Sequence, residues 1–224
     1  MYDELDSVFG PDLRVIDADV GHAGPFTSTM HCNIRPAEFS LMSKFLNARC
    51  TTGDITKTMC ISLVCYSAED LANARGAKEQ SGAWEQVLLR CRPVAWPNRG
   101  PLSALVNDKI PVPLSAPMKV CTSTNHMRFY LVDDRAVCQV FDNVIPISSF
   151  LKAGKNRIQI RQQANLSDFI FFLVAHHPIR GQLKEIAEVR KQEMEWARYV
   201  HGVCRPPETV DEVWERFKMD LKNL

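Results

Sequence analysis

Two adjacent histidines, His176 and His177, are the residues of this chain best suited by type to acid–base chemistry. A serine or cysteine nucleophile needs such a base within hydrogen-bond reach. The pair ends an apolar run directly before Pro178, and neighbouring residues of a strand point to opposite faces, so at most one of them can face a given site. The sequence contains no G-x-S-x-G, no H-E-x-x-H and no glycine-rich phosphate loop. We therefore expect no catalytic residue, and a histidine that ends the strand and bonds to the backbone.

Eight cysteines are scattered along the chain, and no two of them form a C-x-x-C pair. A structural zinc site usually takes at least one close pair of ligands from a single turn. Cys60 and Cys65 are near in sequence, but they lie within one expected strand, where their side chains converge poorly. The sequence therefore predicts no metal site, no cofactor, and free buried thiols in a reducing compartment.

Composition and charge favour one sizeable domain with extensions. The chain has 224 residues, of which 46% are hydrophobic and 24% charged, with a net charge of +1. No apolar run reaches about 18 residues and the acidic N-terminus lacks a signal-peptide core, so we expect a soluble protein made in the cytosol, with no membrane partner. Residues 151–205 carry ten Lys/Arg against five Asp/Glu. This excess leaves nucleic acid open as a weakly supported partner, and an ordinary solvated face explains it better.

The hydrophobic pattern predicts a mainly β protein, an antiparallel β-sandwich. Ile158 and Ile160 alternate with Arg157, Gln159 and Arg161, which is typical of a strand packed on one side only. The run 169–174 is apolar at every position, which indicates a strand buried in the middle of a sheet. At least seven short strands are expected, joined by turns; the others include 57–66, 84–91, 102–106 and 127–132.

The ends of the chain differ from this middle part. Residues 1–25 are acidic and interrupted by glycine and proline, which predicts an N-terminal arm that is flexible or draped over the domain. Residues 26–180 form the expected sandwich. Residues 181–224 are predicted to be a C-terminal helical extension: one amphipathic helix over 182–200, and a second that begins with a capping box at Thr209 and carries apolar residues at helical spacing to Leu221.

Several short motifs resemble one known domain in their order and spacing. Pro146-Ile147-Ser148-Ser149-Phe150 falls where that domain has a proline-isoleucine-asparagine-isoleucine-threonine signature, and an aromatic strand follows that ends at His177-Pro178. The domain is PINIT, found in the PIAS, Siz and Zmiz-type SP-RING proteins, which are SUMO E3 ligases and transcription co-regulators. The other matching segments span about residues 36–185: Glu38–Leu41 as the opening strand, Lys57–Tyr66 as the central strand, Val87–Cys91, Trp96-Pro97, Leu105–Asn107 and Gly154-x-Asn156-x-Ile158-x-Ile160.

The resemblance implies a non-catalytic, substrate-recognising protein module in the nucleus, with a cytoplasmic location as the alternative. The implied partners are a protein substrate, SUMO or the SUMO-conjugating enzyme. Ser148-Ser149 departs from the signature, and the Cys/His spacing of an SP-RING is absent, so the resemblance does not imply ligase activity for this chain. The expected partner-binding surface combines an edge and loops around residues 146–156, which could accept a partner segment by strand addition, with nearby basic side chains. Its residues are Pro146, Ile147, Ser148, Ser149, Lys152, Lys155, Asn156, Arg157 and Arg161.

A carbohydrate-binding β-sandwich of the galactose-binding-like type is the alternative, because L-x-x-G-x-N-x-I-x-I, here Leu151–Ile160, also recurs in such jelly rolls. The lack of a signal peptide and the expected free thiols count against it. Trp84 and Trp96 are expected to belong to the core or its rim and not to a sugar platform.

Overall fold

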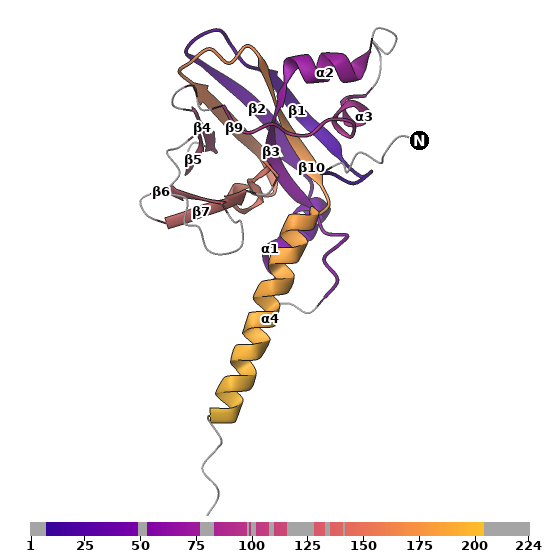
Figure 1. Cartoon of the computed structure of the whole chain (residues 1–224), viewed down its shortest axis with the longest axis vertical. Coiled ribbons are helices and arrows are strands. Elements are labelled where there is room, and N and C mark those ends of the chain that lie inside the picture. The colour runs from indigo at the N-terminus through magenta and orange to yellow at the C-terminus, as the bar shows by residue number, and fades with distance from the viewer. Residues whose placement is uncertain are drawn as a thin grey trace, which may run out of the picture. The chain divides into compact units, whose positions relative to one another are not determined.

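The computed structural model describes residues 8–48, 53–76, 83–97, 99, 102–107, 110–115, 128–132, 135–140 and 142–203 (Figure 1). For residues 110–115, 128–132 and 135–140 it describes the backbone alone. The chain divides into two compact units, Met1–Lys184 and Glu185–Leu224. The first unit holds every described strand and is an antiparallel β-sandwich, as the sequence predicts.

One sheet of the sandwich has the strand order β1-β10-β3-β8. Its strands are β1 (Arg14–Val20), β10 (Phe169–His176), β3 (Cys60–Ser67) and the short β8 (Ile145–Pro146). All three pairings are antiparallel, and Leu63 of β3 faces Leu173 of β10. The expected central strands are therefore confirmed: β3 and β10 lie next to each other inside this first sheet.

The second sheet has the order β2-β9-β4-β5 and is also antiparallel. Its strands are β2 (Phe26–Ile34), β9 (Gly154–Gln162), β4 (Leu102–Val106) and β5 (Ile110–Ser115). A separate hairpin pairs β6 (Arg128–Val132) with β7 (Arg135–Val140). The expected strands over 157–162 and 102–106 are both confirmed.

The hydrophobic core fills the space between the two sheets. Alternate residues of β9 and β4 point inward, including Ile158, Ile160 and Ala104, and they meet Leu63 and Phe171 from the first sheet. The period-2 alternation in the sequence thus separates inner from outer side chains on the second sheet. Burial of apolar area in this layer stabilises the fold by about 25 cal/mol per Å².

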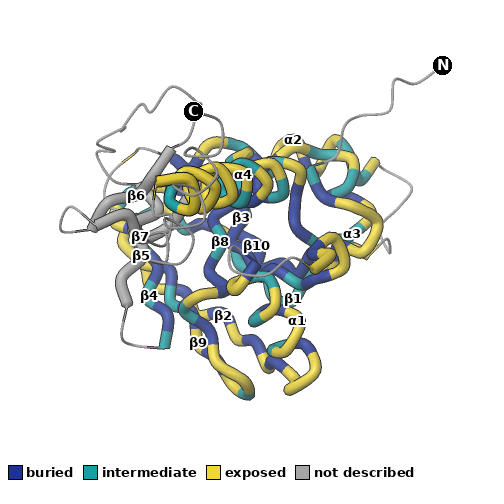
Figure 2. The backbone as a smooth tube through the Cα atoms, turned by 90° about the horizontal axis from the view of Figure 1, so that it is seen from below, coloured by how far each residue is buried: buried dark blue, intermediate teal, exposed yellow. Residues whose placement is uncertain are grey.

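The other face of the first sheet is buried as well, which explains why residues 169–175 of β10 are all apolar. Val64, Tyr66, Phe172 and Val174 point away from the second sheet into another hydrophobic cluster. Two helices, α2 (Ala68–Arg75) and α3 (Trp84–Leu88), supply Leu71, Val87 and Leu88 to that cluster. Figure 2 shows β3 and β10 as largely buried strands between these two layers.

Three local expectations are wrong. Residues 14–20 of the expected arm form an edge strand, β1. Residues 38–41, expected as a strand, belong to helix α1 (Pro36–Leu46), because Pro36 suits the first turn and the Glu38 carboxylate accepts the Arg35 backbone N–H at 2.9 Å. Residues 84–88, expected within a strand, form α3. Helix α2 follows β3 directly, and the Ser67 hydroxyl caps its first turn.

Helix α4 (Arg180–Val203) confirms the predicted amphipathic helix and extends it at both ends. Most of it lies in the second unit. The second expected helix, over 209–221, lies outside the described residues. Within the part of the chain that the structure describes, no helix is both long and apolar enough to cross a membrane.

Candidate protein-binding surface

The outward face of β9 carries the exposed basic side chains that the sequence singled out. Lys155, Arg157 and Arg161 all point away from the core and are exposed. They recur every two or four residues, so Arg157 and Arg161 are separated by roughly 13 Å along the strand. The cationic groups therefore form one row along the exposed face of the strand.

The strands beside β9 widen this surface without adding acidic groups. Arg161 lies opposite Thr27 of β2 and Ser103 of β4, and Arg157 lies opposite His31. The outward residues of β2, β9 and β4 are Thr27, Thr29, His31, Asn33, Ser103, Leu105, Lys155, Arg157, Gln159 and Arg161. None of these ten is a carboxylate, so the face is positively charged at neutral pH. We call this set the β9 face.

β9 is an inner strand of the second sheet. β9 pairs with β2 on one side and with β4 on the other, so its backbone groups are already used. Strand addition to β9 is therefore excluded, and a partner must bind the side chains of the face. Of the expected partner-binding residues, only half-buried Pro146 lies on an edge strand, β8.

The nearest edge of the second sheet, β2, is partly closed by a carboxylate. Oδ2 of Asp17 accepts the backbone N–H of His31 at 2.8 Å, and its Oδ1 accepts the N–H of Ala18 at 2.9 Å. Asp17 belongs to β1, the edge of the other sheet, where Glu85 similarly accepts the Val15 N–H at 2.9 Å. These carboxylates occupy edge donors that another strand would otherwise bind.

Two residues of the signature segment are interior. Ile147 is fully buried in the core, and the Ser148 hydroxyl bonds to Ile61 of β3, accepting its N–H at 2.8 Å and donating to its carbonyl at 3.2 Å. The Ile147 N–H also donates to that carbonyl at 2.9 Å. Ile147 and Ser148 therefore attach the chain to the first sheet, and a partner cannot reach them without opening the fold. Ser149 next to them is exposed.

Asn156 is a buried hub that shapes the loop before β9. Its Nδ2 donates to the carbonyls of Lys152 at 2.7 Å and Gly154 at 3.0 Å, while its Oδ1 accepts the Lys152 N–H at 2.9 Å. Gly154 has φ of +88°, a conformation that glycine adopts without strain. Asn156 thus holds the loop that displays the exposed Lys152, and its own side chain is buried.

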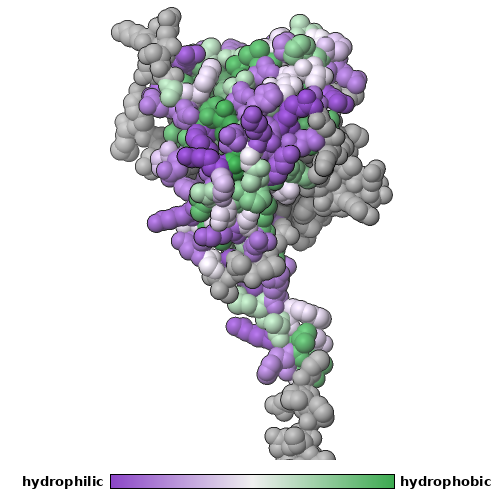
Figure 3. Space-filling view, turned by 180° about the vertical axis from the view of Figure 1, so that it is seen from behind, coloured by the Kyte–Doolittle hydropathy of each residue, from purple (hydrophilic) through white to green (hydrophobic). Residues whose placement is uncertain are grey.

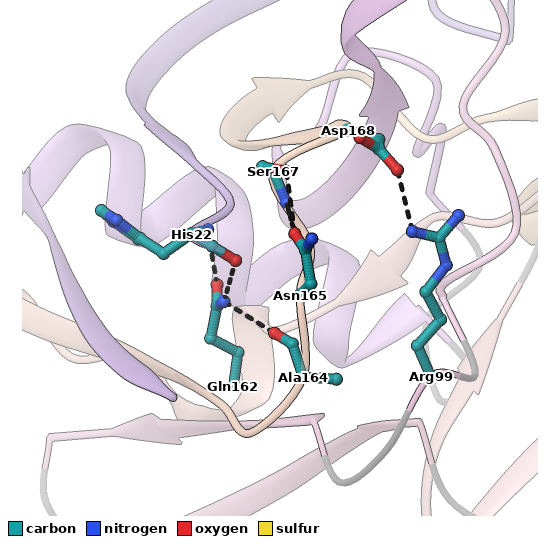
Figure 4. A network of polar contacts seen from close by, with 7 residues as sticks. All are labelled: His22, Arg99, Gln162, Ala164, Asn165, Ser167 and Asp168. Atoms are coloured by element: carbon teal, nitrogen blue, oxygen red, sulfur yellow. Dashed lines mark hydrogen bonds and ion pairs between the residues drawn. The ribbon is translucent and has the colours of Figure 1, made fainter. Parts of the chain in front are cut away.

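A second polar hub lies at the far end of β9, where Gln162 closes the turn between β1 and β2 (Figure 4). Its Nε2 donates to the carbonyls of His22 at 2.7 Å, Gly24 at 2.8 Å and Ala164 at 3.0 Å, and its Oε1 accepts the His22 N–H at 3.1 Å. Arg99 forms an ion pair with Asp168 at 2.8 Å in the same region. The sequence pattern did not indicate the role of Gln162, because a polar residue at an inward position usually marks the end of a strand.

A cavity of about 190 Å³ lies between the first residues of β1 and the last residues of β2, and the sequence pattern did not indicate it. Glu38 lines it, and its Oε1 accepts hydrogen bonds from Arg14 at 2.9 Å and Arg35 at 3.0 Å. The hydrogen bond from Arg35 lowers the pKa of Glu38 to about 2, with smaller contributions from the charges of both arginines. The carboxylate is satisfied by these donors, which indicates a structural ion cluster at the start of α1.

The histidines form structural contacts. Nδ1 of His176 donates to the His177 carbonyl at 2.6 Å, so its Nε2 accepts from the Ser62 hydroxyl at 2.8 Å. Both side chains are buried, and desolvation lowers the pKa of His176 to about 4. His177 donates through Nδ1 to the Thr58 carbonyl at 2.7 Å. Ser62 and His176 have the types of a nucleophile and base, but their burial keeps any substrate away.

The described thiols are held in their neutral form. Burial raises the pKa of Cys32 to about 11, and raises the pKa of Cys60 and Cys65 further. These three are free and buried. The fourth described thiol, Cys91, is also free but half-buried, and burial raises its pKa as well. No group of three or more His, Cys, Asp or Glu side chains suited to a metal ion occurs among the described residues.

Trp84 and Trp96 fit the expected positions in the core or at its rim. Trp96 stacks on Phe171 at 5.6 Å between ring centroids and donates through Nε1 to the Asn143 carbonyl at 3.1 Å. Trp84 packs edge-on against Phe172, with the Arg75 guanidinium 5.0 Å from its ring centroid. Neither ring presents an open face of the kind that stacks on a sugar.

Comparison with known proteins yields structural similarity but no relative by sequence. No protein-family model matches the chain, and no curated protein matches it. The crystal structure of the S. cerevisiae SUMO E3 ligase SIZ2 aligns with 75% of this chain at 10% sequence identity and a TM-score of 0.38. The alignment covers 52% of the SIZ2 chain, so this chain spans about half its length. Similarity at this level does not by itself assign a function.

Proposed function

We propose that this chain is a non-catalytic protein-binding module that uses the β9 face to bind an acidic segment of a protein partner. The observation that carries the proposal is the row of Lys155, Arg157 and Arg161 on an open sheet face whose ten outward residues include no carboxylate. Complementary charge raises the rate of encounter and selects among partners. A polar face with its cations in a row suits an extended acidic peptide.

Loop residues extend the proposed surface beyond the strand. Lys152 and Ser149 are exposed and Pro146 is half-buried, so these three join the cations of β9 as candidate contacts. Asn156 fixes the backbone of Lys152 at two points, which limits the freedom of this loop. A loop that is ordered before binding loses less conformational entropy when the partner arrives. Ile147, Ser148 and Asn156 enter the proposal as supports for the surface and not as contacts.

The resemblance of the motifs to PINIT domains extends the proposal to biology. On that basis the module recognises substrates for sumoylation in the nucleus, among transcription co-regulators, with a substrate protein, SUMO or the SUMO-conjugating enzyme as its partner. Motif order in the sequence supports this extension, with Gly154-x-Asn156-x-Ile158-x-Ile160 as its best-preserved part. The charge of the β9 face supports the acidic character of the partner and says nothing of its identity.

Charge reversal on the β9 face tests the proposal. The double variant Arg157→Glu/Arg161→Glu is compared with the wild type in quantitative capture from nuclear extract. We expect the variant to capture at least about tenfold less acidic protein than the wild type, since it replaces two attractive charges with two repulsive ones. Lys44→Glu/Lys57→Glu is the matched control, because both lysines are exposed and lie outside the β9 face. Its capture should equal that of the wild type.

Two outcomes would contradict the proposal. Equal capture by Arg157→Glu/Arg161→Glu and wild type, with equal urea midpoints for all three proteins, would remove the β9 face from partner binding. Salt-sensitive binding of the wild type to duplex or single-stranded DNA, abolished by the same double variant, would assign the face to nucleic acid instead of protein.

A further inference from the structure

Helix α4 ends in an uncovered apolar stripe within the second unit. Trp196, Tyr199 and Val203 are 64%, 61% and 65% exposed, and Val200 is half-buried beside them. These four residues occupy positions i, i+3, i+4 and i+7, so they share one side of the helix. Figure 3 shows apolar side chains on the last described turns of α4. Met194 is also exposed, but its position falls outside this stripe.

A helix end that faces only solvent normally carries polar side chains, whereas this stripe is apolar. The rings of Trp196 and Tyr199 stack on each other with centroids 5.6 Å apart, although both remain open to solvent. Large aromatic side chains gain most of their stabilisation from burial. A cluster of exposed aromatic and aliphatic side chains in a row marks a contact surface.

We propose that residues 209–221 of this same chain cover the stripe by returning antiparallel along α4 as the second helix of a hairpin. The sequence provides Thr209 as a cap with Glu212 three residues later, which is a capping box. The apolar residues that follow recur at helical spacing and form one face: Val210, Val213, Trp214, Phe217 and Leu221. Two apolar faces on neighbouring segments of one chain can bury each other.

The short connection between the two segments fits a helical hairpin. Residues 204–208 separate the two segments and include Pro206-Pro207, which cannot continue α4. Helical hairpins typically use connections of two to five residues, so the link has the right length and a sharp break. A helix over 209–221 is roughly 20 Å long, and the stripe from Trp196 to Val203 spans roughly 11 Å, so the return segment covers all of it.

The pairing that follows from this geometry is specific. An antiparallel return places Val210 and Val213 near Val203 and Tyr199, and places Phe217 near Trp196. Lys218 then lies close to Glu195, an opposite charge. A short helix is marginal alone and gains its stability from such packing, so the exposed stripe and the amphipathic segment each account for the other.

Hydrogen exchange of the full chain, measured by mass spectrometry, tests the hairpin. We expect the amides of 191–203 to exchange at least about tenfold faster in Val213→Ser/Phe217→Ser than in the wild type, because these changes uncover the stripe. Trp196→Ser/Tyr199→Ser must in return speed exchange in 210–221. Glu215→Ser/Arg216→Ser is the control: it alters the same segment at polar positions, keeps the net charge, and should leave exchange in 191–203 unchanged. Unaltered exchange in β3 and β10 shows that the first unit stays folded.

Other occupants of the stripe give different results. A second copy of the chain would make protection of 191–203 depend on protein concentration, which ultracentrifugation would match to a dimer, and this outcome overturns the hairpin. Docking of a separate partner would leave 191–203 exchanging equally fast in the purified wild type and in Val213→Ser/Phe217→Ser. That result overturns it as well.

Discussion

Asn107 and Asn156 join β4 to the loop before β9: Nδ2 of Asn107 donates to Oδ1 of Asn156 at 2.9 Å. Oδ1 of Asn107 in turn accepts the Arg157 backbone N–H at 3.1 Å. Asn107 adopts a φ of +50° at the end of β4, a conformation that asparagine tolerates better than most residues. The pair therefore fixes the end of β4 and the first residues of the β9 face.

Replacing Asn156 should cost more stability than any surface change nearby. Asn156→Ala leaves the N–H and carbonyl of Lys152 and the Asn107 amide without their partner in a mostly buried site, so the free energy of unfolding should fall by about 2–4 kcal/mol. Urea unfolding measures this fall. Gln163→Ala, at an exposed position just beyond β9, should stay within about 0.5 kcal/mol of the wild type. A double-mutant cycle with Asn107→Ala should show coupling of about 0.5 kcal/mol or more; strict additivity would contradict the hub.

The turn between β1 and β2 contains a glycine that no larger residue can replace. A Cβ added at Gly21 would lie 1.8 Å from the carbonyl oxygen of Leu166, and this backbone is held by the Leu166 N–H, which donates to the His22 carbonyl at 2.9 Å. Gly21→Ala should therefore lower the free energy of unfolding by about 3 kcal/mol or more. Gly24→Ala in the same turn meets nothing within 4 Å and should change it little. Equal thermal midpoints for the two variants would refute this account.

The buried His176 should make the protein sensitive to mild acid. Burial lowers its pKa from 6.5 to about 4 in the folded state, so between these values the unfolded chain binds the proton and the folded protein does not. The contribution of His176 to the free energy of unfolding is therefore fully present above pH 6.5 and is lost as the pH drops toward 4. The loss amounts to roughly 3 kcal/mol in all. The loss levels off below pH 4, where both states are protonated.

Urea midpoints of the wild type and His176→Gln at pH 7.0, 5.5 and 4.5 measure this effect. Glutamine cannot titrate, so the variant should lose less stability than the wild type over this range. The low pKa of Glu38, about 2, places the loss of its own contribution below about pH 4.5, outside the window. Parallel pH profiles for wild type and variant would show that His176 is not the group responsible.

The sequence by itself determined which residues of the strands face inward. Ile158 and Ile160 alternate with Arg157 and Arg161, and this period of two is a local property of an extended chain, so the core side and the β9 face could be read from it. The apolar run of β10 likewise indicated burial on both faces. Those features depend on spacing alone, and the structure confirms them.

Tertiary structure decided what lies next to what. Residues 84–88 contain strand formers and helix formers alike, and they become α3 where Glu85 accepts the Val15 N–H and Val87 and Leu88 enter the cluster over the first sheet. The signature residues Ile147 and Ser148, and Asn156 beside them, were expected on the surface but turn inward, because backbone groups of β3 and of the Lys152 loop need their hydrogen bonds. β9 became a central strand because β2 and β4 come to it from distant parts of the chain. Such pairings depend on contacts across the whole fold, and no local pattern encodes them.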